Sequence, residues 1–497
     1  LVLPFENRSG NATLNWIGNS FPDTLDKRLN SVGVLTISHD DRAFALTHLG
    51  LPPDFRPSRA TTIRIAQQLD ANFVIIGSFT TTGSRINIQS QVLSVDALRL
   101  SSPVDDGADL NRLYDAENAV AWKVARAIDP GINVAEQTFV ASSGAVPLPA
   151  FENYIRGINA STPAEAIQRL GTAIASAPTY VAALLALGKQ QFNARDFGAA
   201  AATLAKIPQS DPQSLEANFY LGLARFNTAN YAAAATAFEF VASRLPLPEV
   251  VNDQGVALAR QGKDAVPLFQ RASAADPSDA DYHYNLAISL FRRGELQPAL
   301  QQADAALKLK PSDNEAGSLR AHLSIAPPGT RLAQNPDGGF SPVERIRRSY
   351  SETGFRQAAF QLDQLRAARL AMLPPDKRAA EYTDLGREYL AQGLLPEAEQ
   401  QFQSALAADP RSAVAHAGLA QVREKTGSAA EARGEAQQSL NLQPNVPALL
   451  VLARLDLAQN QLSTSADEVT RALHLEPANA AALALRQNLQ QRGQAIP

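Results

Sequence analysis

The stretch Tyr382–Pro410 reads YTDLGREYLAQGLLPEAEQQFQSALAADP, and Tyr282–Pro311 reads YHYNLAISLFRRGELQPALQQADAALKLKP. Each holds two runs of apolar residues at the spacing of a helix that buries one face, and a glycine separates the two runs. Each ends on a proline, which is disfavoured inside helices and common just past their ends. Each stretch therefore predicts two antiparallel helices and a turn.

The closing proline recurs along the chain at nearly the same interval. The interval is close to the period of a repeated helical hairpin. The prolines form two series, and the distance from the last proline of the first series, Pro311, to the first of the second, Pro410, is close to three intervals. The prolines are Pro178, Pro212, Pro246, Pro277 and Pro311, then Pro410, Pro444 and Pro477. One helical hairpin cannot cover its own apolar face but stacked neighbours can, so about eight units predict an α-solenoid.

Small residues recur where the two helices of a hairpin must approach closely. We expect three such pairs to lie at helix crossings: Gly188 with Ala200, Gly222 with Ala234, and Gly386 with Ala398. The period and these residue types resemble the tetratricopeptide repeat (TPR) over roughly Pro149–Pro497. The resemblance implies an α-helical TPR superhelix that binds other proteins.

A proline- and glycine-rich stretch interrupts the repeats. Ile325–Pro342 reads IAPPGTRLAQNPDGGFSP, which predicts a loop over 326–342 between a first TPR block, 150–325, and a second, 343–497. The second block is expected to open with a helix over Val343–Leu373. The surrounding stretch Arg331–Arg378 is basic, with 9 basic and 5 acidic residues, and forms either a solvated helix face or a partner-docking face.

Residues 1–129 follow a different pattern, and 130–149 is expected to be a linker. Alternating or β-branched runs predict four strands: Val2–Phe5, Val32–Ser38, Phe73–Thr81 and Arg85–Val95. Helical periodicity predicts three helices: Leu14–Asn30, Thr61–Leu69 and Leu110–Ile128. The order β-α-β-α-β-β-α is typical of a small α/β or α+β domain.

Four pieces of this region carry a second resemblance. They are LPFENRSG (Leu3–Gly10), GNSFPDTLDKRLNSVGVLTIS (Gly18–Ser38), IAQQLDANFVIIGSF (Ile65–Phe79) and INIQSQVLSVDA (Ile86–Ala97). In this order they resemble the TolB N-terminal-like family and its FlgO-like relatives, which implies a bacterial cell-envelope protein. The sequence departs from the family at Leu98–Asp109, where LRLSSPVDDGAD replaces an acidic, tryptophan-containing strand.

Composition and charge exclude several classes of partner. The net charge is −4 and neither half of the chain is strongly charged, which argues against nucleic acid or an anionic membrane as the main partner. The sequence has no cysteine, which excludes disulfides and thiolate chemistry. No apolar run reaches the ~18 residues that span a bilayer. The sequence opens on a strand-like run and its only methionine is Met372, so we expect a signal peptide or membrane anchor upstream of Leu1. The expected location is the bacterial periplasm or cell envelope, with the cytoplasm as an alternative.

Motifs for catalysis, cofactors and metals are missing. The sequence holds no phosphate-binding loop, no HExxH and no GxSxG, and no two of its six histidines lie three or four residues apart. His39-Asp40-Asp41 is typical of a helix start, and Asp105-Asp106 with Asp109 of an acidic turn with too few oxygens for calcium. We therefore predict that the protein is not an enzyme and has no catalytic, cofactor-binding or metal-binding residues.

Aromatic residues on the first helices of the repeats are candidates for partner binding. By register we expect six side chains in the groove of the superhelix: Lys189, Phe192, Phe219, Phe226, Tyr284 and Phe291. Alternatively, the phenylalanines pack against the neighbouring repeat. A carboxylate clamp is not supported, because Leu223 and Ile288 stand where its asparagine is expected.

These observations predict a non-enzymatic scaffold or adaptor of the bacterial cell envelope that binds proteins through the TPR superhelix. The expected ligand is a peptide or helix in the groove, or a larger assembly. The alternative is the sensory or regulatory region of a membrane-anchored signalling protein, with a kinase or DNA-binding output domain upstream. A lipobox or cleavable signal before Leu1 would favour the first, and a transmembrane helix behind a cytoplasmic domain the second.

Overall fold

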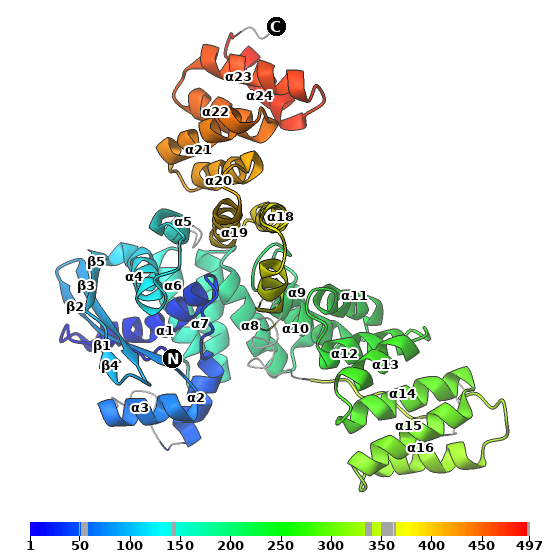
Figure 1. The fold of residues 1–497 in the computed structure, drawn as a ribbon. Coiled ribbons are helices and arrows are strands. Elements are labelled where there is room, and N and C mark those ends of the chain that lie inside the picture. The colour runs from blue at the N-terminus through cyan, green and yellow to red at the C-terminus, as the bar shows by residue number, and fades with distance from the viewer. Residues whose placement is uncertain are drawn as a thin grey trace. The chain divides into compact units, whose positions relative to one another are not determined.

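A computed structural model describes residues 1–48, 50, 58–141, 146–332, 340–348, 361 and 364–494, without the side chain of Asp40. The chain forms two compact units, of which one combines Leu1–Ile155 with Phe360–Pro497 and the other is Arg156–Ala359. A small sheet with its helices occupies the start of the chain, and helical hairpins follow (Figure 1). The predicted fold class, a helical solenoid preceded by a small domain with a sheet, is confirmed.

The sheet is built around one long hairpin. Strands β2 (Phe73–Thr82) and β3 (Arg85–Ser94) pair antiparallel as predicted, with Gly83 in the turn at a φ of 62°. The other strands are β1 (Glu6–Asn7), parallel to β2, and β4 (Arg99–Leu100) and β5 (Val104–Asp109), both antiparallel to β3. Alternate residues of β3 from Ile86 to Val92 are buried, and all of them except Ser90 are apolar, so this face of the sheet is mainly apolar.

Two long helices lie together in this domain. Helices α1 (Asn15–Asn30) and α4 (Leu113–Ile128) pack on each other, and α4 also packs on β3 and β5 (Figure 1). The shorter helices are α2 (His39–His48) and α3 (Arg59–Gln68), and the single-turn helices are η1 (Ala12–Leu14) and η2 (Leu110–Arg112).

Two sequence predictions for this domain are wrong. Val32–Ser38 is not a strand, because Leu1–Leu3 takes the place beside β2: the Leu3 N–H donates to the Ile75 carbonyl at 3.1 Å. Val2 itself makes only an isolated bridge to Ile75, which is all that remains of the predicted strand Val2–Phe5, and the strand β1 begins after it, at Glu6.

The acidic run near Asp105 is also not a turn. Asp105, Asp106 and Asp109 lie in β5, which pairs with β3 from Arg85 to Ser90. Aspartates flank Gly107 and Ala108, so the run lacks the alternating apolar residues by which strands are recognised in a sequence. The hydrogen-bonded pairing with β3 stabilises the strand, although the local sequence has a low propensity for it.

The stretch expected to be a linker is partly helical. Helix α5 (Glu136–Ala141) falls within it, and α6 (Leu148–Ile158) begins at its end. Phe139 of α5 is fully buried, and the guanidinium of Arg28 lies 4.1 Å from the centre of its ring. A buried aromatic ring anchors this part of the stretch on the domain.

The repeats form helical hairpins in both units. In the second unit the helices are α7 (Pro163–Ser176), α8 (Val181–Asn193), α9 (Phe197–Leu204), α10 (Ser214–Asn227), α11 (Tyr231–Ala242), α12 (Pro248–Ala259), α13 (Val266–Ala275), α14 (Ala280–Arg293), α15 (Leu296–Leu309) and α16 (Asn314–Ile325). In the first unit they are α18 (Pro375–Gln392), α19 (Leu395–Ala408), α20 (Ala413–Lys425), α21 (Ala429–Leu442), α22 (Val446–Ala458), α23 (Leu462–Leu475) and α24 (Ala480–Gln491).

Glycine at the helix crossings makes room for a large side chain. A Cβ on Gly222 would lie 2.6 Å from the ring of Phe238, and a Cβ on Gly386 would lie 2.7 Å from the ring of Phe402. Both rings are fully buried. The ring packs against the helix across from it because the glycine has no side chain, so the atoms nearest Gly222 and Gly386 belong to a ring and not to the alanine that we expected opposite each of them.

A buried carboxyl group in the first unit predicts an unusual dependence of stability on pH. Glu117 of α4 is fully buried, and the hydroxyl groups of Ser20 and Thr24 donate to its two oxygens, the latter at 2.6 Å. Burial raises the pKa of Glu117 to about 8. Between pH 5 and pH 8 the folded protein therefore keeps a proton that the unfolded chain releases, and the free energy of unfolding falls as the pH rises.

Glu117→Gln should remove this dependence, since glutamine keeps the shape but does not titrate. Urea unfolding can be followed by the fluorescence of Trp16 and Trp122, the only tryptophans, which both report on residues 1–129. We expect the midpoint to fall more between pH 5 and pH 8 in the wild type than in the variant, in which only the shifts of other buried groups, such as Glu397 and the Leu1 amino group, remain. Glu136→Gln, at an exposed position, is the control and should behave as the wild type. Parallel profiles for the wild type and Glu117→Gln would contradict the assignment.

Candidate functional site

Two successive repeats of the second unit begin with matched acidic pairs. Asp279 and Asp281 stand at the start of α14, and Asp313 and Glu315 stand one repeat later at the start of α16. Asp279 and Asp313 are N-cap residues, whose side chains accept hydrogen bonds from main-chain N–H groups that have no partner within the helix. The pairs place a row of negative charge across two repeats.

Two asparagines, one repeat apart in the chain, lie beside this row. Asn252 of α12 and Asn285 of α14 are both fully buried. The Asn285 amide donates to Asn252 Oδ1 at 2.8 Å, and the Asn252 amide donates to the neighbouring Asp253 at 3.1 Å. Buried amides are costly unless they are hydrogen-bonded, so each remaining donor and acceptor needs a partner.

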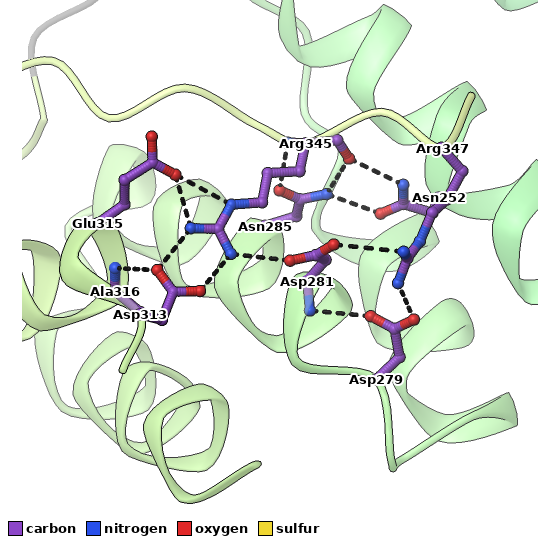
Figure 2. A network of polar contacts seen from close by, with 9 residues as sticks. All are labelled: Asn252, Asp279, Asp281, Asn285, Asp313, Glu315, Ala316, Arg345 and Arg347. Atoms are coloured by element: carbon purple, nitrogen blue, oxygen red, sulfur yellow. Dashed lines mark hydrogen bonds and ion pairs between the residues drawn. The ribbon is translucent and has the colours of Figure 1, made fainter. Parts of the chain in front are cut away.

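Residues 340–348, here named the docked segment, supply those partners. The segment is neither helix nor strand and runs across α12, α14 and α16 (Figure 2). The N–H of Arg345 donates to Asn285 Oδ1 at 2.7 Å, and its carbonyl accepts from Asn285 Nδ2 at 2.8 Å and from Asn252 Nδ2 at 3.1 Å. The N–H of Arg347 donates to Asp253 at 2.8 Å. These bonds hold the main chain of the segment without reading its side chains.

The arginine side chain at 345 reaches into the acidic row. Its guanidinium donates to Asp281 at 2.8 Å, to both oxygens of Asp313 at 2.6 and 2.8 Å, and to Glu315 at 2.6 Å. The same group stacks on the ring of Tyr284, with 3.9 Å to the ring centre. The fork of donors matches a carboxylate bidentately, which lysine cannot do.

These contacts shift the pKa values of both partners. Burial opposes the charge of Arg345, but hydrogen bonds to the three carboxylates outweigh it and raise the pKa of the guanidinium. Hydrogen bonds from Arg345 lower the pKa of Asp313 to about 2. The contribution of Asp313 is therefore fully present above its usual pKa of 3.8 and is lost as the pH falls toward 2.

The neighbouring side chains extend the charge pattern. Arg347 pairs with Asp279 and lies 3.4 Å from Asp281. The carboxylate of Glu344, which is fully buried, pairs with Arg292 and lies 3.8 Å from Arg260. The contacting residues of the helices and their N-caps, here named the docking face, are Asn252, Asp253, Arg260, Asp279, Asp281, Asn285, Arg292, Asp313 and Glu315.

The docked segment corrects the helix expected over Val343–Leu373. Residues 343–348 are not helical, because side chains of the docking face take the main-chain groups of Arg345 and Arg347 that a helix would use internally. Residues 349–360 and 362–363 lie outside the described residues, and residues 364–371 are helical. In the basic stretch, Arg345 and Arg347 pair with acidic residues of the same chain, and the binding of a partner by this stretch stays a prediction.

Family models described as tetratricopeptide repeat match residues 159–219, 259–314 and 383–447. These stretches are tetratricopeptide repeats. The match over residues 259–314 contains Asp279, Asp281 and Asp313 of the acidic pairs and most of the docking face, and it ends one residue before Glu315. Proteins of this fold serve as scaffolds that bind peptides or other proteins, and no enzymatic family is indicated.

Several solved structures are similar to part of this chain. A crystal structure of MamA is 19% identical with a TM-score of 0.30, and the match covers 32% of this chain and 96% of that one. MamA from Desulfovibrio magneticus RS-1 is 19% identical with a TM-score of 0.32, over 34% and 99% of the two chains. YrrB, described as a TPR protein with an unusual peptide-binding site, is 16% identical with a TM-score of 0.31, over 42% and 100%. No curated protein matches the sequence.

Of the two partner-binding residues expected on α14, Tyr284 lies beside the docking face and Phe291 lies in the core. Tyr284 carries the guanidinium of Arg345 on its ring. Phe291 is buried in the core, and its carbonyl accepts from the Leu332 N–H at 3.2 Å. Asn285, one residue after Tyr284, makes the hydrogen bonds to the docked segment. On α14 the residue that holds the main chain of the segment is therefore Asn285, one position after the predicted Tyr284.

The expected residues on α8 and α10 lie among other repeat residues. Lys189 pairs with Glu216 at 2.7 Å, and Phe192 meets the ring of Tyr220 edge-on. Phe219 is fully buried in the core of the stack, and Phe226 is half-buried in the same core. Their role in binding a partner stays a prediction.

The sequence carries two signals for the docking face that the aromatic pattern hides. Asparagine recurs at about the repeat period in three successive first helices, at Asn218, Asn252 and Asn285. The stretches PSDAD (277–281) and PSDNE (311–315) repeat an acidic pair after the closing proline. A polar residue that recurs at the repeat period on a buried helix needs a partner, and this marks a binding face.

The other two candidate sites, near His39 and Asp106, form a helix cap and an ion pair. Ser38 caps the start of α2, with its hydroxyl accepting from the Asp41 N–H at 3.0 Å, so His39 begins a helix as expected. Asp106 pairs with Lys123 at 2.9 Å. Among the described residues, no three acidic or histidine side chains gather as a metal site would require. In that same part of the chain, no helix combines the length and apolar character needed to cross a bilayer.

Proposed function

We propose that this protein is a non-enzymatic scaffold that binds an extended segment of a partner protein on the docking face of its first TPR block. The observation that carries the proposal is the paired hydrogen bonding of Asn285 with the N–H and carbonyl of Arg345. This arrangement holds an extended main chain in one register, whichever chain supplies it. A surface that already holds one extended segment is suited to another of the same chemistry.

The docking face also has the properties of a selective site. The amides of Asn252 and Asn285 hold the main chain, and the acidic pairs select side chains by charge and geometry. Main-chain hydrogen bonds supply affinity for any extended segment, and bidentate carboxylate–guanidinium pairs add specificity. Nothing in this chemistry requires a reaction.

The setting we propose is the bacterial periplasm or cell envelope. The resemblance of residues 1–129 to the TolB N-terminal-like family supports this setting. The net charge of −4, with acidic and basic residues mixed along the chain, supports a protein partner over nucleic acid. A membrane would enter only through an anchor upstream of Leu1.

A display library of random twelve-residue peptides tests the binding function. It is selected on the full chain carrying Arg345→Ala/Arg347→Ala, which removes the side-chain contacts of the docked segment and frees the docking face. We expect enriched peptides to lose at least tenfold in affinity, by fluorescence anisotropy, when Asp313→Asn/Glu315→Gln is added to this chain. Asparagine preserves the N-cap of α16 and both changes keep the side-chain shape. Asp304→Asn is the control, because Asp304 is exposed and pairs with Arg320 outside the docking face. No enrichment, or equal binding to all three proteins, would show that the docking face does not bind peptides.

A further inference from the structure

The docked segment has the features of a bound ligand more than those of a structural element. It has no secondary structure, and the partners of Arg345 and Arg347 are side chains of the docking face. Its main chain and its three charged side chains, Glu344, Arg345 and Arg347, are held by polar contacts. Of its apolar side chains, Pro342 is buried and Val343 is 50% exposed, while Phe340, which stacks on His322, and Ile346 are only partly buried against the core. An element that stabilises a core places apolar side chains within it, whereas polar contacts of this kind can be replaced by an equivalent segment.

We propose that the docked segment is a built-in competitor, which occupies the docking face until a partner's extended segment with the same pattern, acid–arginine–apolar–arginine, displaces it. The proposal rests on the proposed binding function and adds the chemistry of the partner and a means of regulation. The pattern corresponds to Glu344, Arg345, Ile346 and Arg347.

The docking face specifies each position of this pattern. The acid is enclosed by Arg260 and Arg292, so a basic residue there would face like charges. The first arginine lies among three carboxylates and on a tyrosine ring, which suits a planar guanidinium better than an ammonium. The second arginine pairs with Asp279, a weaker position because its side chain is 32% exposed. The residue between them contacts the apolar core.

The short chain between α16 and the docked segment keeps the segment close to the docking face, so it competes strongly with a partner but can still be displaced. The segment follows α16 closely in the chain, which gives it an effective concentration of about a millimolar at the docking face. A partner segment of equal intrinsic affinity must exceed that concentration, or bind more tightly through further contacts. Mutations that weaken the internal segment should therefore raise the apparent affinity for a ligand in trans.

Binding of a labelled copy of the segment tests this. The probe is fluorescein-labelled FSPVERIRR, the sequence of residues 340–348. We compare the full wild-type chain with Arg345→Ala/Arg347→Ala, in which the internal segment is disabled. The double variant should bind the probe at one site at least tenfold more tightly than the wild type does, as millimolar competition implies. A probe with both arginines replaced by alanine should not bind, and adding Asp313→Asn/Glu315→Gln to the double variant should abolish binding.

Each alternative result has a defined meaning. Equal affinity of wild type and double variant, no binding to the double variant, or binding that survives Asp313→Asn/Glu315→Gln would overturn the proposal. A wild-type dimer that dissociates in the double variant would also overturn it, by showing exchange of the segment between two copies. Circular dichroism checks folding, and Arg347→Ala alone, which keeps the Arg345 contacts, should have an intermediate affinity. Library peptides that bind the docking face without the arginine pattern would overturn the competitor and leave the binding function standing.

Discussion

Replacing Phe238 by alanine should destabilise the helical stack of the second unit by about 3–5 kcal/mol, as for other fully buried phenylalanines. Phe238 has no exposed surface, and its ring fills the space that Gly222 leaves open on the facing helix. It also meets Phe219 edge-on, with ring centres 6.0 Å apart. The cavity left by the ring would border α10 and α11 at once, and stacked helices relax little around such a void.

Phe240→Ala is the matched control for this prediction. Phe240 lies on the same helix, is only half-buried and carries the guanidinium of Arg244 on its ring. We expect it to cost clearly less than Phe238→Ala in urea unfolding followed by far-UV circular dichroism. Hydrogen exchange should show faster opening of α10 and α11 in the Phe238 variant. Equal costs for the two variants would mean that the glycine and the ring do not act as a pair.

This aromatic–glycine pairing explains why the helical part of the fold is predictable from sequence. Each repeat places a glycine or alanine and a large apolar residue at fixed positions, and a wrong register would put two large side chains at one crossing. Phe269 opposite Gly255 and Phe402 opposite Gly386 repeat the arrangement. Because local periodicity and tertiary packing require the same residues, the pattern specifies both.

The first domain is less predictable because its chain pairs over long distances. Val32–Ser38 has the apolar character of a strand, but Leu1–Leu3 occupies the position beside Ile75. The run around Asp105 has the character of a turn, but β3 holds it as a strand. In both cases the partner, not the segment itself, decides the structure.

The docking face was missed for a related reason. The aromatic pattern of the sequence predicts a binding row at residues such as Tyr284, whereas Asn252 and Asn285, at neighbouring positions on the helices, hold the segment. The docked segment is rich in helix-forming residues, and the sequence alone does not show that Asn285 and Asp253 take its main-chain groups. The recurrence of asparagine and of the acidic pairs at the repeat period is the signal that would have revealed it.

Asp313→Asn should make the chain at least tenfold more sensitive to trypsin at the bond after Arg345. Trypsin needs the arginine and its neighbours free, so cleavage reports the population of the undocked state. Hydrogen bonds to a charged group contribute roughly 1.5–3 kcal/mol each. Asp313 provides two of them, to a guanidinium whose side chain is 19% exposed. Losing the charge while keeping the shape weakens both, and each ~1.4 kcal/mol raises the open population tenfold.

Two internal references make the result specific to docking. Arg411 is exposed in the turn before α20 and belongs to the other unit, so cleavage after it should be the same in both proteins. Asp304→Asn, which removes an exposed partner of Arg320, should leave both rates unchanged. Asparagine also caps helices well, so α16 should remain intact, and its amide hydrogen exchange can verify this. Equal protection of the Arg345 bond in Asp313→Asn and wild type would mean that the acidic row does not hold the segment, and that the asparagine pair alone is sufficient.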